Sequence, residues 1–290
     1  MSSNKFTFRG LMAPVFTVFN EDYTVNVDCI PKYAEYLKKS NITGVLVNGT
    51  TGEGMSLSVA ERKLVTEKWN EVCTDLNIAL MVQIGGAPYP DVIELAKHAY
   101  ETKVPSMLCL PELYFKPKTE EDLVEYLDGI SKVAPGVPIL YYHIPMFTGV
   151  NLNMPRFISL AKKKIPEFAG IKYSNGDLEQ ISPAVNSGVT IFIGSDMILC
   201  SALALGFDSS IMTTLNICPE ISVNILNAVK SGKMEDAKKL QWNLNERVSE
   251  ITGNGKYGWI PSMKREFNKV MKQKGEICAG KVRKPLKDLE

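Results

Sequence analysis

The sequence predicts an α/β protein, a (β/α)8 TIM barrel with additional C-terminal helices. Eight short apolar runs alternate with amphipathic helical stretches, which is the pattern of βα units on a parallel sheet. After the eighth run the strands stop, and two further helical stretches follow at residues 234–251 and 261–274. The alternative is a doubly wound open sheet. It needs a glycine-rich dinucleotide fingerprint after its first strand, and residues 17–20 contain no glycine, so the eight units favour the barrel.

Local signals set the boundaries of these elements. Ser58 with Glu61, and Thr119 with Asp122, have the spacing of capping boxes and predict the starts of two helices. Pro219 suits the first turn of a third helix. The predicted strands cover residues 10–17, 44–47, 79–84, 106–110, 139–142, 168–172, 190–193 and 209–213.

Length and charge limit the classes of function. The chain has 290 residues and 45% hydrophobic content, enough for a full core. We expect residues 1–230 to form the barrel and residues 231–290 to form a helical extension packed on it, as one structural unit. The 33 basic and 32 acidic residues are intermixed with no basic stripe, so nucleic acid is not expected as a partner.

Cysteine spacing and hydropathy indicate the compartment. The six cysteines include no CxxC pair, so neither a zinc site nor a thioredoxin-type motif is supported, and free thiols in a reducing compartment are the simplest interpretation. The N-terminus lacks the apolar segment of a signal peptide, and no apolar run approaches the ~20 residues of a spanning helix. We therefore expect a cytoplasmic protein without a membrane partner.

Lys172 is the first candidate for chemistry. It closes the apolar run at residues 168–171, which is expected to form a buried strand, and polar residues follow almost at once. Burying an unpaired ammonium is costly, so a lysine here needs a reason. The chemical reason would be a free amine that attacks a ketone and forms an imine. The structural reason would be a strand-end lysine that extends its amine to solvent.

The second candidate is the glycine-rich segment at residues 48–54, NGTTGEG, which follows the second strand. Three glycines with Thr50 and Thr51 can form a nest of backbone N–H groups with two hydroxyls beside it. Such a nest binds a carboxylate or a phosphate. The segment lacks the GK[ST] of a nucleotide-binding loop. A plain turn would explain the glycines about equally well.

The third candidate lies at the end of the fifth strand, at Tyr141 and Tyr142. Adjacent strand residues point to opposite faces, so one of the two tyrosines faces the barrel interior. There it could shuttle protons beside a lysine and a threonine, or it could be a core aromatic with a satisfied hydroxyl. His98 and His143 show no metal-ligand spacing, and no GxSxG occurs, so neither a metal site nor a hydrolase triad is indicated.

Together these segments resemble the class I aldolases of the N-acetylneuraminate lyase and dihydrodipicolinate synthase superfamily. GTTGE at residues 49–53, YxxP at residues 142–145 and GxKxS at residues 170–174 occur in the family's order and approximate spacing, and the resemblance spans essentially the whole chain. The segment 141–150 looks most like that of the animal N-acetylneuraminate lyases. The synthase branch usually has an arginine in this loop, and this chain has none.

The resemblance implies a Schiff-base mechanism that requires no metal and no organic cofactor. Lys172 would attack the ketone carbon of pyruvate or of the open-chain sugar acid. Gly49, Thr50 and Thr51 would cradle the carboxylate of the keto acid. Tyr142 would relay a proton between the C4 hydroxyl of the sugar and the carboxylate, with Thr50 assisting.

The resemblance also implies a subsite for the sugar tail, and there the chain departs from the family. The lyases carry Gly-x-Asp-Glu on the seventh strand, whereas this chain keeps Gly194 and Asp196 but has Met197 in place of the glutamate. On the eighth strand Thr213 could replace a serine hydroxyl, and Ser174 and Gly194 should contact the substrate chain. Because methionine cannot accept hydrogen bonds as a carboxylate does, we expect weaker affinity for the glycerol tail or a shifted preference among sialic acids.

The expected function is the reversible cleavage of N-acetylneuraminate to pyruvate and N-acetylmannosamine. One alternative is another pyruvate-dependent aldolase, such as a 2-keto-3-deoxy sugar acid aldolase or a dihydrodipicolinate synthase. A second is a barrel that binds sialic acid or a keto acid without turnover, against which the joint retention of Lys172, Tyr142 and Thr51 argues. Tyr114 resembles the aromatic loop that reaches into a neighbouring subunit in this family, and the family resemblance suggests a homotetramer.

Overall fold

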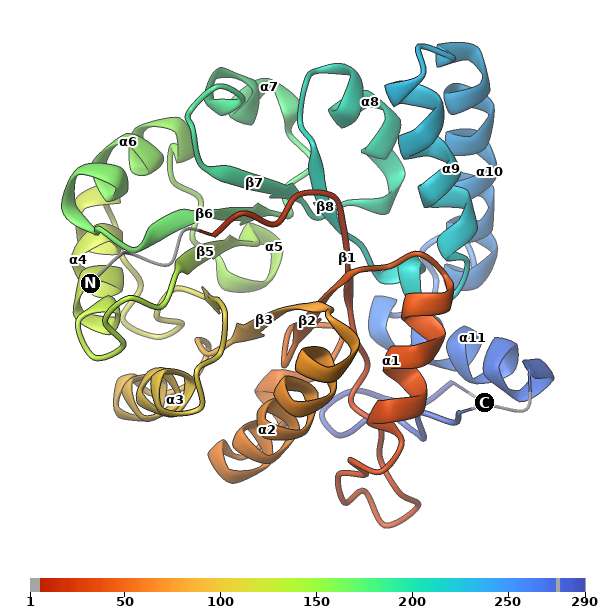
Figure 1. Cartoon of the computed structure of the whole chain (residues 1–290), viewed down its shortest axis with the longest axis horizontal. Coiled ribbons are helices and arrows are strands. Elements are labelled where there is room, and N and C mark those ends of the chain that lie inside the picture. The colour runs from red at the N-terminus through yellow and green to blue at the C-terminus, as the bar shows by residue number, and fades with distance from the viewer. Residues whose placement is uncertain (1–5, 275–276, 290) are drawn as a thin grey trace.

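The computed structural model describes residues 6–274 and 277–289 and contains a closed barrel of eight parallel strands, with helices around it (Figure 1). Each strand pairs with the next in chain order, and β8 pairs with β1 to close the ring. The strands are β1 Leu11–Pro14, β2 Gly44–Val47, β3 Ala79–Gln83, β4 Met107–Cys109, β5 Ile139–His143, β6 Phe168–Tyr173, β7 Thr190–Ile193 and β8 Ser209–Ile211. The prediction of a (β/α)8 barrel with C-terminal helices is confirmed.

The helices follow the strands, as βα units require. In chain order they are α1 Ile30–Lys39, α2 Val59–Leu76, α3 Tyr89–Glu101, α4 Glu120–Ser131, α5 Pro145–Thr148, α6 Met154–Lys164, α7 Leu178–Ile181, α8 Leu199–Ala204, α9 Pro219–Lys230, α10 Met234–Thr252 and α11 Trp259–Lys274. Within the described residues there are also four short 3₁₀ turns, η1 Gly54–Ser56, η2 Ser182–Ala184, η3 Asp196–Ile198 and η4 Thr213–Asn216. None of the helices in the described residues is long and apolar enough to cross a membrane.

The predicted helix starts occur where the capping signals place them. The Ser58 hydroxyl accepts from the Glu61 amide while the Glu61 carboxylate accepts from the Ser58 amide, and Thr119 and Asp122 make the same reciprocal pair. Each box satisfies amides that the first helical turn leaves without partners. Pro219 begins α9, where a missing N–H costs nothing.

Four predicted strands are longer than the observed ones, namely β1, β3, β4 and β8. At β1 and β8 side chains draw the backbone out of the sheet. After Pro14 the chain keeps one ladder bond, from the Val15 amide to the Leu46 carbonyl, and the next amide donates to the hydroxyl of Tyr33. At β8, the carboxylate of Asp196 accepts from both the amide and the hydroxyl of Thr214. That carboxylate stabilises the turn η4 immediately after the strand.

The strands separate two layers of core. Side chains that point into the barrel, including Met12, Leu46, Leu140 and Phe192, form an inner cluster, and the alternate residues pack outward against the helices. Tyr142 belongs to the inner cluster and Tyr141 to the outer layer. The alternation therefore selects Tyr142 as the tyrosine that faces the barrel interior.

The last two helices bring the C-terminal part of the chain to the carboxyl ends of the strands. In Figure 1, α10 lies beside α9, and α11 lies near α1. The contact between α11 and α1 includes the rings of Phe267 and Tyr33, whose centroids are 5.0 Å apart. Helix α11 begins at Trp259, two residues before the predicted start at Pro261, because a proline is tolerated in the first turn of a helix.

Candidate active site

A cavity of about 290 Å³ opens at the carboxyl ends of the strands, the end at which TIM barrels carry their chemistry. Nine of the residues predicted from sequence line it, namely Thr50, Thr51, Tyr142, Lys172, Ser174, Gly194, Asp196, Met197 and Thr213. They come from five different segments of the chain, at the ends of β2, β5, β6, β7 and β8, so the barrel topology gathers them.

Lys172 lies on β6 with its side chain directed into the barrel. The residue is 4% exposed, and its ladder partner on β5 is Tyr142. Its Nζ donates to the Tyr142 hydroxyl at 3.1 Å and lies 4.3 Å from the centre of the tyrosine ring. Across the described chain, no carboxylate comes within ion-pair distance of this amine. The nitrogen therefore has a hydroxyl neighbour and an open cavity in front of it, the setting that a nucleophilic amine needs.

Tyr142 connects Lys172 to the glycine-rich loop. Its hydroxyl lies 3.1 Å from Lys172 Nζ and 3.1 Å from the hydroxyl of Thr50. Because the phenol oxygen accepts from the lysine, its own hydrogen is free for Thr50 or for a substrate oxygen. The three side chains form a continuous path for a proton between β6, β5 and the loop after β2.

The loop at residues 49–53 belongs to the glycine-rich segment that is predicted to form a nest. The amides of Gly49, Thr50 and Thr51 donate to no acceptor within the described residues, so they are free to bind an anion. The Thr51 hydroxyl is hydrogen-bonded to that of Thr213 at 3.0 Å. The turn is closed by Gly54, where a Cβ would lie 1.9 Å from the carbonyl oxygen of Asn48. Only a glycine fits this close approach.

Gly49 is in the nest but not among the residues that line the cavity. Its carbonyl accepts from the Gly54 amide at 3.1 Å, which helps to hold the turn closed. A contact between Gly49 and a substrate would therefore be limited to its amide.

Ser174 and Gly194 lie in contact just after the carboxyl ends of β6 and β7. A Cβ on Gly194 would lie 1.9 Å from the Ser174 hydroxyl, so the serine depends on the glycine for its position. The Ser174 Oγ is buried and has no hydrogen-bond partner among the described residues. A buried hydroxyl without a partner is costly, which makes Ser174 a candidate for binding a polar substrate atom.

Asp196 and Met197 form the wall beside β7, and they differ in role. The Asp196 carboxylate is buried and already accepts from Thr214 at 3.0 and 2.5 Å, and burial raises its pKa. Met197 is 38% exposed and presents a thioether and methylenes to the cavity. The part of the wall that is accessible here is therefore apolar.

Several lining residues are absent from the sequence prediction. The short helix α5 contributes Met146 and Phe147, the loop after β6 contributes Asn175, and the start of α11 contributes Trp259 and Ile260. The indole Nε1–H of Trp259 donates to the Thr213 hydroxyl at 3.2 Å and so continues the Thr51–Thr213 pair. A tryptophan following a glycine-rich connection between the last two helices is the signal that could have drawn attention to this segment.

Within a single chain, Tyr114 does not line the cavity. It is 84% exposed, and its ring packs edge-on against the equally exposed Phe115, with centroids 5.0 Å apart. His98 bonds to Glu67, and His143 stacks on Tyr173 in the outer layer, where burial lowers its pKa to about 4. Across the described ranges, no group of three His, Cys, Asp or Glu side chains is arranged to hold a metal ion.

Known proteins resemble this chain along nearly its full length. The profile of the dihydrodipicolinate synthetase family matches residues 7–290. N-acetylneuraminate lyase A of Xenopus laevis is 32% identical over 281 residues, which cover 96% of this chain and 90% of that protein.

Solved structures show the same likeness. The native N-acetylneuraminate lyase (sialic acid aldolase) of Aliivibrio salmonicida superposes with a TM-score of 0.90 at 31% identity, over 98% of this chain and 92% of that one. The N-acetylneuraminate lyase of Proteus mirabilis superposes with a TM-score of 0.89 at 28% identity, over 98% and 94% of the two chains.

Proposed function

This chain belongs to the dihydrodipicolinate synthetase family, and we propose that it is a Schiff-base-forming class I aldolase that reversibly cleaves N-acetylneuraminate to pyruvate and N-acetylmannosamine. The relatives that carry this name support the substrate. The observation that carries the chemistry is the path from Lys172 Nζ through the Tyr142 hydroxyl to Thr50, with both contacts at 3.1 Å, at the base of an open cavity.

The first chemical step is formation of an imine. The nitrogen of Lys172 attacks the C2 carbonyl of the open-chain sugar acid, a C–N bond forms, and the carbonyl oxygen leaves as water. The free amides and hydroxyls of Thr50 and Thr51 bind the neighbouring carboxylate and so hold C2 against the lysine. The protonated imine then serves as the electron sink for the bond that breaks.

The second step is cleavage between C3 and C4. Tyr142 passes its phenol hydrogen to the bound carboxylate and takes the proton of the C4 hydroxyl, with Thr50 assisting, as the C4 carbonyl forms. The bonding electrons move into an enamine on Lys172, and N-acetylmannosamine departs. Protonation of the enamine and hydrolysis of the imine release pyruvate and restore the amine.

The apolar wall at Met197 favours a second candidate, an aldolase that keeps pyruvate and uses a different aldehyde. Pyruvate release from N-acetylneuraminate and from 2-keto-3-deoxy sugar acids separates the two. We expect the higher kcat/KM with N-acetylneuraminate. Turnover of the 2-keto-3-deoxy sugar acids alone would support the second candidate function. If none of these substrates releases pyruvate, the proposed cleavage reaction is refuted.

Replacing Met197 by glutamate should lower the KM for N-acetylneuraminate. The new carboxylate can accept hydrogen bonds from the glycerol tail, and a charge-assisted bond contributes roughly 1.5–3 kcal/mol, or about 10- to 100-fold in affinity. Steady-state kinetics of Met197→Glu would measure this change. The control is Leu205→Glu, which puts the same charge on an exposed apolar position outside the cavity. An unchanged or higher KM in Met197→Glu would show that the tail does not reach this wall.

We propose further that the protein is a homotetramer in which Tyr114 reaches a neighbouring subunit. Its support is the exposure of Tyr114 and Phe115, whose rings pack together in the single chain, since contiguous exposed apolar groups mark interfaces. Light scattering should give four times the chain mass of 32.2 kDa. A monomer in solution would refute this arrangement.

We also propose a cytoplasmic location and a barrel at residues 1–230 that forms one unit with the extension at residues 231–290. All six cysteines are free, and four of them are buried, which suits a reducing compartment. Trp259 of the extension lines the cavity, which supports one unit. Fractionation of the producing cells would test the location, and a single cooperative unfolding transition would test the unit.

A further inference from the structure

A buried ion pair anchors the glycine-rich loop to the C-terminal part of the chain. The carboxylate of Glu53 accepts from Lys264 Nζ at 2.8 Å, and the two side chains are 0% and 2% exposed. Lys264 belongs to α11, 211 residues further along the chain, and its Nζ also donates to the carbonyl of Lys281 at 2.9 Å. The second carboxylate oxygen of Glu53 accepts from the amide of Arg283 at 2.7 Å.

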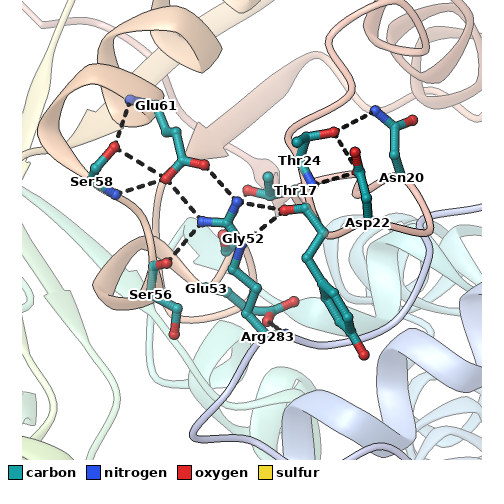
Figure 2. A network of polar contacts seen from close by, with 11 residues as sticks. Thr17, Asn20, Asp22, Thr24, Gly52, Glu53, Ser56, Ser58, Glu61 and Arg283 are labelled. Atoms are coloured by element: carbon teal, nitrogen blue, oxygen red, sulfur yellow. Dashed lines mark hydrogen bonds and ion pairs between the residues drawn. The ribbon is translucent and has the colours of Figure 1, made fainter.

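The side chain of Arg283 binds residues close to the same loop, as Figure 2 shows. Its guanidinium donates to both oxygens of the Glu61 carboxylate at 2.5 and 2.8 Å and to the carbonyl of Ser56 at 3.0 Å. It also donates to the carbonyl of Tyr23, from Nη2 at 2.6 Å. Arg283 thus links the C-terminal segment by hydrogen bonds to η1, to the capping box of α2 and to the loop after β1.

The Lys264 ammonium and the Arg283 amide both bind Glu53, a residue whose backbone needs support. Glu53 has φ +54° and ψ +32°, the left-handed region, which a non-glycine residue adopts only when its surroundings hold it there. Its amide donates to the carbonyl of Thr50 at 3.0 Å, and two residues earlier Thr51 lines the cavity. The side-chain anchors of Glu53 therefore lie at the end of the turn whose amides are free.

We propose that Glu53, Lys264 and Arg283 are positioning residues for the carboxylate nest, so that the C-terminal segment at residues 277–289 sets the affinity for the keto acid. This inference rests on the proposed function, since it needs the nest to bind a keto-acid carboxylate. An apolar pair of similar size would pack here about as well as the ion pair does. The proposal therefore gives a reason for the burial of two charges at this point.

The test is borohydride trapping of pyruvate on the full chain at increasing pyruvate concentration. In Arg283→Ala we expect the half-saturating pyruvate concentration to rise about 10-fold, because a displacement on the order of 1 Å in a positioning group can cost up to about 100-fold. At saturating substrate, kcat should stay close to the native value, which is the signature of lost binding rather than lost chemistry. Arg283→Lys should recover part of the affinity because it keeps the charge.

Arg247→Ala is the matched control. Arg247 also contacts two glutamates, Glu250 and Glu266, but it lies between α10 and α11 and makes no contact with the loop at residues 49–53. We expect the control to lose stability without a change in half-saturation. If Arg283→Ala does not fold, the double variant Glu53→Gln/Lys264→Met replaces the ion pair without leaving a buried charge, and the same rise is expected.

The outcomes are distinguishable. A native chain that traps no pyruvate overturns the proposed function and this inference together. A native chain that traps pyruvate, with folded variants that half-saturate at the native concentration, overturns the inference alone. A fall in kcat with unchanged half-saturation also overturns it, because the loop would then act on the chemical step and not on the carboxylate.

Discussion

Replacing Lys172 by alanine is expected to abolish pyruvate release from N-acetylneuraminate. The amine is the atom that forms the C–N bond, and no other lysine among the described residues lines the cavity. Enzymes accelerate reactions by about a million-fold or more, so a chain without its covalent route should fall below the detection limit of an ordinary assay. The variant should remain folded, because the Tyr142 hydroxyl keeps its bond to Thr50.

The measurement is a coupled assay for pyruvate, with the unfolding midpoint of each variant measured in parallel. Lys132→Ala serves as the control, because Lys132 is exposed at the end of α4, pairs with Asp128, and does not line the cavity. Pyruvate release at a rate comparable to the native chain in a folded Lys172→Ala would refute the imine mechanism.

Replacing Tyr142 by phenylalanine is expected to lower kcat by about 100- to 10,000-fold, the usual contribution of a positioned proton-transfer group. The ring of Tyr142 packs in the inner core of the barrel, so phenylalanine keeps the packing and removes the hydroxyl alone. The effect should lie mainly in kcat, because the hydroxyl acts when the C3–C4 bond breaks. Imine trapping with pyruvate should persist, since that step needs the amine of Lys172.

Tyr141 provides an unusually close control for this experiment. It is the adjacent residue on β5, it faces the outer layer, and its buried hydroxyl has no hydrogen-bond partner in the described chain. Tyr141→Phe should therefore leave kcat unchanged. Equal losses in the two variants would contradict a proton-transfer role for Tyr142 and point to a general effect on β5.

Much of the fold was accessible from local signals in the sequence. The two capping boxes and Pro219 set helix starts to the residue, because each is a contact within one turn of chain. The ends of β1 and β8 were harder, since they depend on Tyr33 and Asp196, which are distant in sequence and meet those strands only in the fold. Periodicity cannot report such contacts.

The residues of the candidate site also fall into two groups, those that local sequence signals indicate and those that only the fold brings together. Lys172 and Tyr142 could be selected because each ends a predicted strand, and Thr50 because it lies in the loop that follows one. Parallel strands in a barrel bring their carboxyl ends together. Alternation predicted that one of Tyr141 and Tyr142 faces the interior, and the resemblance to the family implied Tyr142. The structure has Tyr142 in the inner cluster and Tyr141 in the outer layer.

Residues outside the strands were missed for a different reason. Trp259 reaches the cavity because α11 packs on α1, and Met146 and Phe147 reach it from a four-residue helix that has no periodic signal. The Glu53–Lys264 pair joins positions 211 residues apart, and neither residue differs from an ordinary surface charge in sequence. Long-range packing, rather than local propensity, places these groups.

The measurement that tests the central claim most directly is reduction of the native chain with borohydride in the presence of pyruvate, followed by peptide mass mapping. The proposed mechanism predicts one pyruvate-dependent adduct, located on the peptide that contains Lys172. It also predicts that N-acetylneuraminate gives the same adduct on the same peptide, because its cleavage leaves pyruvate bound to Lys172. No adduct, or an adduct on a different lysine, would contradict the imine at Lys172 on which the proposed function depends.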